Sequence, residues 1–138
     1  MIDLEWCNAF NIGYQPIDDD HKRLLDAMKR LRDALVENDL DQGRVLAQQV
    51  LETAGGHFRF EEGFLAEIKY PDLAQHEAYH QELLTRALEI KKHCENAGHP
   101  DDVQSCFDAM ARFLVDDVIA GDLRFKSYLE HCGYISRY

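Results

Sequence analysis

The sequence predicts an all-α protein, an up-down-up-down antiparallel four-helix bundle with an N-terminal aromatic arm. Four long segments of the 138-residue chain repeat apolar residues with the period of a helix. No stretch shows the apolar–polar alternation that a half-buried strand requires. The connections between the periodic segments are about three to six residues long, which forces consecutive helices to be antiparallel neighbours. We therefore expect a single domain over residues 1–138 with one modest core.

The first two helices are predicted from their ends as well as from their periods. Residues 1–17 are rich in aromatic side chains, so we expect them to pack along the bundle as the arm. The first helix is predicted over about 18–38, because the acidic run 18–20 suits a helix N-terminus. The second is predicted over about 42–69, because Tyr70–Pro71 prevents its continuation. The inward-facing residues are predicted to be His21, Leu24, Leu25, Met28, Leu31 and Leu35, then Leu46, Val50, Ala54, His57, Phe60, Glu61, Phe64, Leu65 and Ile68.

The third helix is predicted over about 73–95 and the fourth over about 102–132, separated by Gly98–His99–Pro100. Two adjacent glycines, Gly55 and Gly56, fall inside the second helix. Each costs a helix interior up to about 1 kcal/mol relative to alanine. The pair indicates either a distortion or close helix approach, or a tolerated surface irregularity.

The composition excludes several classes of partner. The net charge of -11 and the pI near 4.9 argue against nucleic acid and anionic membranes, because both require a basic surface. No apolar run approaches the ~18 residues that span a bilayer. The N-terminus also lacks the basic segment and apolar core of a signal peptide. We expect a cytoplasmic protein with no membrane insertion.

The four cysteines are widely spaced and form no CxxC pair. This spacing argues against a zinc knuckle and against a thioredoxin-type motif. We expect Cys7, Cys94, Cys106 and Cys132 to be free buried thiols.

Four histidines and one glutamate interrupt the apolar stripes of three helices. These residues are His21, His57, Glu61, His76 and His80. A single histidine on an apolar face is more often a hydrogen-bonded core residue than a ligand, but a core carboxylate is costly unless it is paired or binds metal. With Leu114 as the centre of the fourth stripe, Asp117 lies at about 60° and Asp122 at about 80°, so both border the interior. Imidazoles and carboxylates converging from four helices predict a carboxylate-bridged dinuclear metal site.

Residues 76–80 also read HEAYH, a formal match to the HExxH motif of zinc proteases. On a helix Glu77 lies about 100° from His76, toward a flank. The chain continues as QELLTR after His80, without the third histidine of the metzincin pattern. Four helices consume the chain and leave no second lobe for a peptide cleft, which disfavours this alternative.

The motifs, in this order and spacing, resemble those of the bacterial hemerythrins over nearly the whole chain. The sequence reads IDDDHKRL where the family has IDxQHKxL, HFRFEE where it has HFxxEE, and YPDLAQHEAYH where it has YPxxxxHxxxH. The resemblance implies two non-haem iron ions with an oxo or hydroxo bridge, and dioxygen as the ligand. His21 and His57 are then ligands of the iron that takes dioxygen, and Glu61 bridges the two irons. His76 and His80 are ligands of the other iron.

The chain departs from the family pattern on the fourth helix, where the family has HIxxxD and residues 117–122 read DVIAGD. Asp122 keeps the bridging position, while Asp117 stands in place of the fifth histidine. Asp117 either coordinates through oxygen or leaves a position for water or an external ligand. If it coordinates, the added anion favours the ferric state and makes reversible oxygen carriage harder to maintain. The other replaced positions are Asp20, Phe113 and Phe125.

Two function classes fit such a site. The first is a carrier or sensor, in which dioxygen, nitric oxide or another small diatomic or anionic ligand alters the helices and informs a signalling domain or partner. The second is a peroxidase- or oxidase-like enzyme that uses the position altered at Asp117. An inert bundle would give the buried ligand-type side chains no reason to converge. We favour the binding module, because no substrate cleft is evident, and expect Phe58, Leu114 and Val118 to cover the exchangeable iron with apolar surface.

Overall fold

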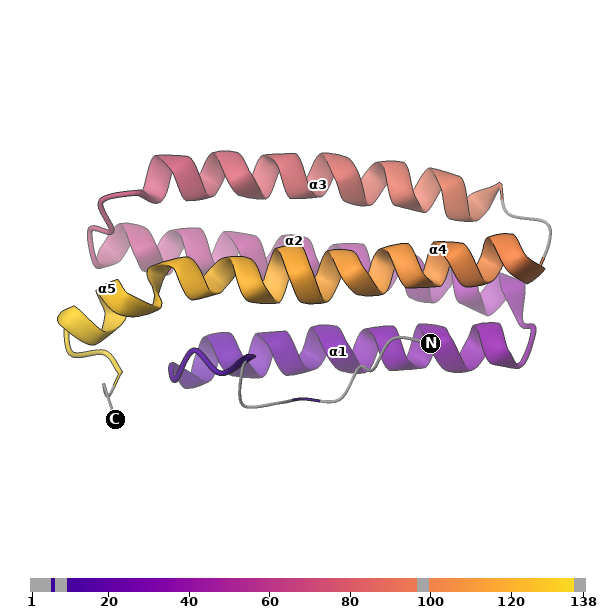
Figure 1. The fold of residues 1–138 in the computed structure, drawn as a ribbon, viewed down its shortest axis with the longest axis horizontal. Helices are drawn as coiled ribbons and strands as arrows, with labels where there is room; N and C mark the ends of the chain where they lie inside the picture. The colour runs from indigo at the N-terminus through magenta and orange to yellow at the C-terminus, as the bar shows by residue number, and fades with distance from the viewer. Residues whose placement is uncertain (1–5, 7–9, 97–99, 136–138) are drawn as a thin grey trace.

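A computed structural model describes residues 6, 10–96 and 100–135 of the chain, with the backbone alone at Pro100, Asp101, Val103 and Asp117. These residues form helices and no strand, so the all-α prediction is confirmed. Four long helices lie side by side (Figure 1). Each packs against the next along the chain, and the fourth also contacts the first. The helices are α1 (Gln15–Val36), α2 (Leu40–Glu67), α3 (Leu73–Glu95) and α4 (Pro100–Arg112).

Helix α1 begins at Gln15, three residues before its expected start. Pro16 lies in its first turn, where the fixed φ of proline suits a helix and no backbone donor is lost. Asp18 is in this turn but is buried, and its carboxylate accepts hydrogen bonds from the backbone N–H groups of Ile12 (2.9 Å) and Gly13 (3.0 Å). The first aspartate of the acidic run therefore ties the preceding segment to the start of the helix.

Helices α1 and α2 end in the same way, with one residue in the left-handed conformation just beyond the helix. Asn38 has φ 61° and Lys69 has φ 59°. The backbone N–H groups that follow bond back to helix carbonyls, which satisfies acceptors that a helix end leaves free. Asp39 then caps α2 by accepting a hydrogen bond from the backbone N–H of Gln42 at 3.1 Å. Helix α3 has the bounds that its sequence pattern predicts.

The fourth segment differs from the single α-helix expected over 102–132. After α4 the chain forms a π-helical stretch, η2 (Phe113–Ile119), and then a 3-10 stretch, η3 (Ala120–Phe125). It resumes as α5 (Lys126–His131), which follows η3 directly and is set off from the long helix by a bend in Figure 1. The hydrophobic period could not reveal this change, because it follows which residues are buried and not which carbonyl each N–H contacts. Asp117 and Asp122 both belong to this irregular part.

The core consists of two apolar clusters with polar residues between them. Along α1, His21 lies between Ile17 of the smaller cluster and Leu24 of the larger one. Along α2, Glu61 separates Phe58 of the larger cluster from Phe64 of the smaller one. The ligand-type residues thus occupy one level of the molecule, where the apolar packing is interrupted.

One residue predicted to face inward does not. Phe60 is 43% exposed, whereas Phe58 is 2% exposed. Two positions along an α-helix correspond to a rotation of about 200°, so a stripe that buries Phe58 directs Phe60 outward.

The prediction of free buried thiols is wrong for three of the four cysteines. Cys94, at the end of α3, and Cys106, in α4, form a disulfide with Cα atoms 5.3 Å apart. Cys132 is free but exposed, and Cys7 lies outside the described residues. Spacing along the chain could not reveal the pair, because the connection between α3 and α4 is what brings the two positions together.

Within the described part of the chain, none of the helices is long and apolar enough to cross a bilayer. The cytoplasmic location stays a prediction.

Candidate metal centre

Six predicted ligand residues come together in the interior. His21 comes from α1, His57 and Glu61 from α2, His76 and His80 from α3, and Asp122 from η3. All six are buried, with at most 4% of any one exposed. Their ligand-type atoms form two overlapping groups, and within each group these atoms all lie within 4.8 Å of one another.

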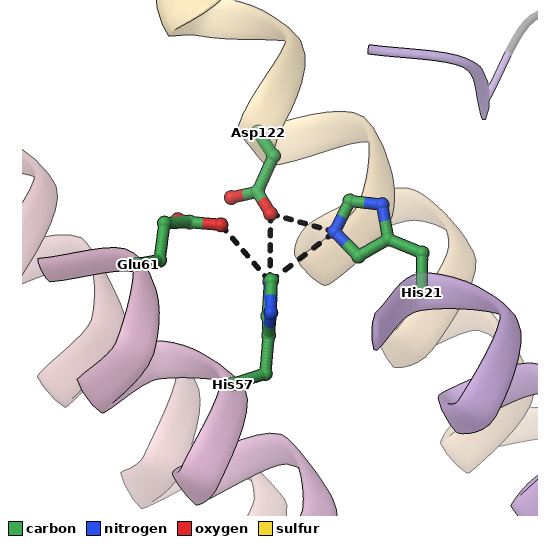
Figure 2. A group of neighbouring side chains, drawn as sticks. All are labelled: His21, His57, Glu61 and Asp122. Carbon is green, nitrogen blue, oxygen red and sulfur yellow. Dashed lines mark hydrogen bonds and ion pairs between the residues drawn. The ribbon is translucent and has the colours of Figure 1, made fainter. Parts of the chain in front are cut away.

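The first group joins α1, α2 and η3, and its side chains point toward one another in Figure 2. The Nε2 atoms of His21 and His57 are 3.2 Å apart. One oxygen of Asp122, Oδ2, lies 2.7 Å from His21 Nε2 and 2.9 Å from His57 Nε2. Glu61 Oε2 lies 2.9 Å from His57 Nε2. Two imidazole nitrogens and two carboxylate oxygens therefore surround one small volume.

The second group joins α2, α3 and η3. Glu61 Oε1 lies 2.5 Å from His76 Nε2 and 3.1 Å from His80 Nε2. Asp122 Oδ1 lies 3.5 Å from His76 Nε2. Each carboxylate thus directs one oxygen to the first pair of histidines and its other oxygen to the second pair. This is the arrangement that two carboxylates require to bridge two metal ions.

The contacts around His57 and Glu61 fit a metal better than they fit a hydrogen-bonded core. Two ligands at right angles on a metal with bonds of about 2.1 Å lie about 3.0 Å apart. Neighbouring donor atoms here are 2.5 to 3.5 Å apart. His57 Nε2 faces three other polar atoms but carries at most one proton, and buried Glu61 Oε2 has no hydrogen bond among the described residues. An orphaned carboxylate oxygen is costly unless a cation satisfies it.

Contacts within the cluster shift the pKa values of several of its side chains. Burial alone would lower the pKa of His57, but hydrogen bonds to Asp122 and Asp20 and the nearby charge of Glu61 raise it well above its usual range. Burial likewise acts to lower the pKa of His76, and hydrogen bonds to Asp122 and Glu61 outweigh it and raise this pKa to about 9. The same contacts hold the pKa of Asp122 well below its ordinary value despite burial. These shifts favour the charged forms of His57, His76 and Asp122, so a metal ion would compete with protons for these side chains.

Two carboxylates behind the histidines were missed as functional residues. His57 Nδ1 donates to Asp20 Oδ2 at 3.1 Å, and His80 Nδ1 donates to Glu62 Oε1 at 3.2 Å. The sequence held a signal for both. Glu62 follows the candidate bridge directly, and Asp20 precedes the first candidate ligand.

Apolar and aromatic side chains surround the cluster. Phe58 stacks on His80 with ring centroids 4.2 Å apart, and Phe125 meets His76 edge-on at 5.3 Å. Leu114 and Val118 are each 1% exposed and belong to the larger apolar cluster. That Phe58, Leu114 and Val118 cover a ligand stays a prediction.

The predicted seventh ligand, Asp117, is described only by its backbone, which lies in η2. Its side chain lies outside the described residues. Its coordination therefore stays a prediction.

The close helix approach proposed for the adjacent glycines occurs elsewhere. A Cβ atom on Gly55 or Gly56 would come no closer than 3.5 Å to any neighbour, and that neighbour is the end of Arg59. Gly121 differs, because a Cβ there would lie 2.7 Å from the ring of Tyr79. The glycine that admits a close contact is thus the one beside Asp122.

Comparison with known proteins agrees with this geometry. The family model of the hemerythrin HHE cation binding domain matches residues 12–120. The chain belongs to the hemerythrin family. The matched region includes all four histidines of the cluster and Glu61, and it ends two residues before Asp122.

Similar proteins come from bacteria and eukaryotes. A bacteriohemerythrin of Stenotrophomonas maltophilia is 29% identical over 91 residues, which are 66% of this chain and 60% of that protein. The chain thus spans 60% of the length of that bacteriohemerythrin. A hemerythrin-like protein of Naegleria gruberi is 25% identical over 91% of this chain and 93% of its own length. A myohemerythrin of Sipunculus nudus is 25% identical over 90% and 92%, respectively.

Membership of this family gives the cluster a chemical meaning. Hemerythrins bind dioxygen at non-haem iron, and the histidine and carboxylate groups of this chain can hold a metal. Imidazole and carboxylate together form a donor set that suits iron.

Proposed function

We propose that the protein binds a pair of bridged non-haem irons and, through them, dioxygen or a related small ligand, as a carrier or as a sensor of oxygen, nitric oxide or redox state. One observation carries the proposal: Glu61 and Asp122 each direct one oxygen to each pair of histidines. In this arrangement His21 and His57 would hold one iron, and His76 and His80 would hold the other. Glu61 and Asp122 would be shared between the two irons.

The chain's own residues would then shape the binding of the ligand. When bound, iron supplies the affinity for dioxygen and the change of oxidation state. Phe58 packs flat against His80 and restricts the movement of that ring. Leu114 and Val118 are buried and apolar, so they exclude water and slow the entry of protons to the ligand. A dry pocket of this kind favours binding over turnover.

Asp117 stands where the family pattern has a histidine, and we propose that it coordinates one iron directly or through water. The helical period predicts that this carboxylate borders the interior, where without a ligand it would have to protonate or find another donor. Either mode makes that iron more exchangeable than one held by a further histidine. Azide and nitric oxide should therefore bind readily.

The finer points of the fold belong to the same proposal. We infer that the four helices alternate in direction within one domain over residues 1–138, with the residues that precede α1 as an arm along them. Short connections support the alternation, since residues 37–39 and 68–72 alone join the first three helices. Support for the arm comes from Trp6, which packs against the larger apolar cluster and lies under Lys22 of α1, 5.0 Å from its Nζ atom.

Metal analysis and an optical spectrum test the proposed function. After aerobic expression in iron-replete medium we expect about two irons per chain, with charge-transfer bands in the near ultraviolet. Glu61→Gln should lose the paired site, because it removes a charge that both irons share. Glu67→Gln is the matched control, since Glu67 is an exposed residue of the same helix. A folded wild-type protein that holds a single zinc and takes up no iron would refute the proposal.

A reductant assay separates the two function classes. The carrier or sensor predicts that dioxygen binds without sustained consumption when a reductant is present. Continuous consumption of dioxygen would instead identify an enzyme.

A further inference from the structure

Two of the four histidines make a hydrogen bond on the side of the ring that faces away from the cluster. His57 Nδ1 donates to Asp20 at 3.1 Å, and His80 Nδ1 donates to Glu62 at 3.2 Å. Both rings are buried, with side chains 1% exposed, while the two carboxylates are 21% and 24% exposed. Each carboxylate therefore lies at the border between core and solvent, directly behind a candidate ligand.

The two hydrogen bonds fix the orientation of the rings. A carboxylate only accepts, so the proton must reside on Nδ1, and the lone pair of Nε2 then points into the cluster. This is the tautomer that binds a metal through Nε2. His21 lacks such support, because its buried Nδ1 has no hydrogen-bond partner among the described residues.

Each of the two groups contains one of these histidine–carboxylate pairs. His57 belongs to the group with His21, and His80 belongs to the group with His76. Each half of the centre thus contains one histidine with an anionic partner behind it. The carboxylate of Asp20 also contacts the guanidinium of Arg23, which lies one turn further along the same helix.

We propose that Asp20 and Glu62 are positioning residues of the metal centre, one for each iron, and that their charges lower the reduction potential of the irons. This inference rests on the proposed function. An anionic partner makes the imidazole a stronger donor, and a stronger donor stabilises ferric iron more than ferrous iron. Loss of such a partner typically costs 10–100-fold in metal affinity.

Three variants separate charge from hydrogen bonding. Asp20→Asn and Glu62→Gln keep a carbonyl oxygen that can accept from Nδ1 but remove the charge. Asp20→Ala removes both. Asp26→Asn and Glu67→Gln are the controls, because each removes one negative charge from an exposed position on the same helix as its counterpart.

The readouts are iron content, competition with a chelator, and the reduction potential of the iron-loaded protein. We expect Asp20→Asn and Glu62→Gln to retain two irons with a raised potential, by about 59 mV for each tenfold loss of ferric relative to ferrous affinity. Asp20→Ala should in addition bind metal 10–100-fold more weakly. Both controls should keep the wild-type potential.

Wild-type potentials in both Asp20→Asn and Glu62→Gln, with unchanged chelator competition, would overturn the inference while leaving the di-iron proposal intact. If the wild-type protein binds only zinc, the proposed function fails on its own. Chelator competition for zinc then still tests the two carboxylates, since they orient the histidines for either metal. Unchanged zinc affinity in Asp20→Ala would overturn the inference in that case.

Discussion

Replacing Gly121 with alanine should disturb the candidate metal centre through a single steric contact. Gly121 is buried in η3, directly before Asp122. A Cβ atom there would lie 2.7 Å from Cε1 and 2.8 Å from the hydroxyl oxygen of Tyr79. Both separations are much shorter than a van der Waals contact. Arg124 lies over the same ring at 4.2 Å, which restricts the directions in which Tyr79 can move.

The expected cost follows from overpacking. An extra methyl group forced into a packed site costs about 1–3 kcal/mol. If the backbone of η3 yields instead of the ring, Asp122 moves with it, and the shared carboxylate no longer reaches both pairs of histidines. We therefore expect Gly121→Ala to lower both the free energy of unfolding of the metal-free protein and the iron content of the loaded protein.

A double-mutant cycle with Tyr79→Ala identifies the contact. Urea unfolding of the metal-free proteins gives the cost of Gly121→Ala in each background. With Tyr79 truncated, the added methyl group has room and should be neutral or stabilising by about 0.4–1 kcal/mol, as Gly→Ala changes are at compatible sites. Gly56→Ala is the control, because its Cβ would meet only the end of Arg59, at 3.9 Å. An equal cost in both backgrounds would refute the steric reasoning.

Four further outcomes are expected. Asp117→His should raise the reduction potential and lengthen the lifetime of the dioxygen complex, measured by potentiometry and stopped-flow spectroscopy; unchanged values would place Asp117 outside the coordination sphere. Leu114→Ala should speed the decay of that complex, and an unchanged rate in a folded variant would count against an apolar cover. In the metal-free protein the pKa of His76 is raised from an ordinary 6.5 to about 9. The stabilising contribution of His76, on the order of 3 kcal/mol, is therefore present in full below pH 6.5 and is lost as pH rises through 9. Urea unfolding across this range measures the contribution, and a free energy of unfolding that did not fall would contradict it. Reducing the Cys94–Cys106 disulfide, which spans 12 residues, should lower the free energy of unfolding by about 3 kcal/mol, and equal stability of the oxidised and reduced proteins would argue against a stabilising link.

The clustering of the histidines could be predicted from the sequence because it follows from the helical period. His21, His57, His76 and His80 each repeat the spacing of apolar neighbours that are buried, so each must face the same interior. The same holds for Glu61. On a regular helix the direction of a side chain follows from its position relative to the apolar stripe. It can therefore be predicted without knowing where the other helices lie.

Features that depend on contact between elements could not be predicted in this way. Asp20 and Glu62, which accept hydrogen bonds from His57 and His80, lie at the edge of the buried face of their helices. The hydrophobic period does not show which way a side chain at that edge points. The disulfide is of the same kind, since it depends on how α3 and α4 meet. Asp122 is an intermediate case. The helical period placed it at the border of the interior, about 80° from the centre of the stripe, whereas the residue is only 1% exposed.

The position of Asp122 follows from the irregular segment that carries it. Between Leu114 and Asp122 the chain first passes through η2, a π-helix that turns less per residue than an α-helix, and then enters η3, a 3-10 stretch that turns by about 120° per residue, so both irregular runs set the direction of Asp122. The hydrogen bonds of a 3-10 stretch have poorer geometry than those of an α-helix, and such stretches persist only where packing holds them. Here Ile119 and Phe125 on either side are fully buried. Three regular helices thus supply the histidines and Glu61, while the 3-10 stretch η3 supplies the other shared carboxylate, Asp122. Because metal ions would bind both oxygens of Asp122, metal binding and the ordering of this segment are thermodynamically linked, and each stabilises the other.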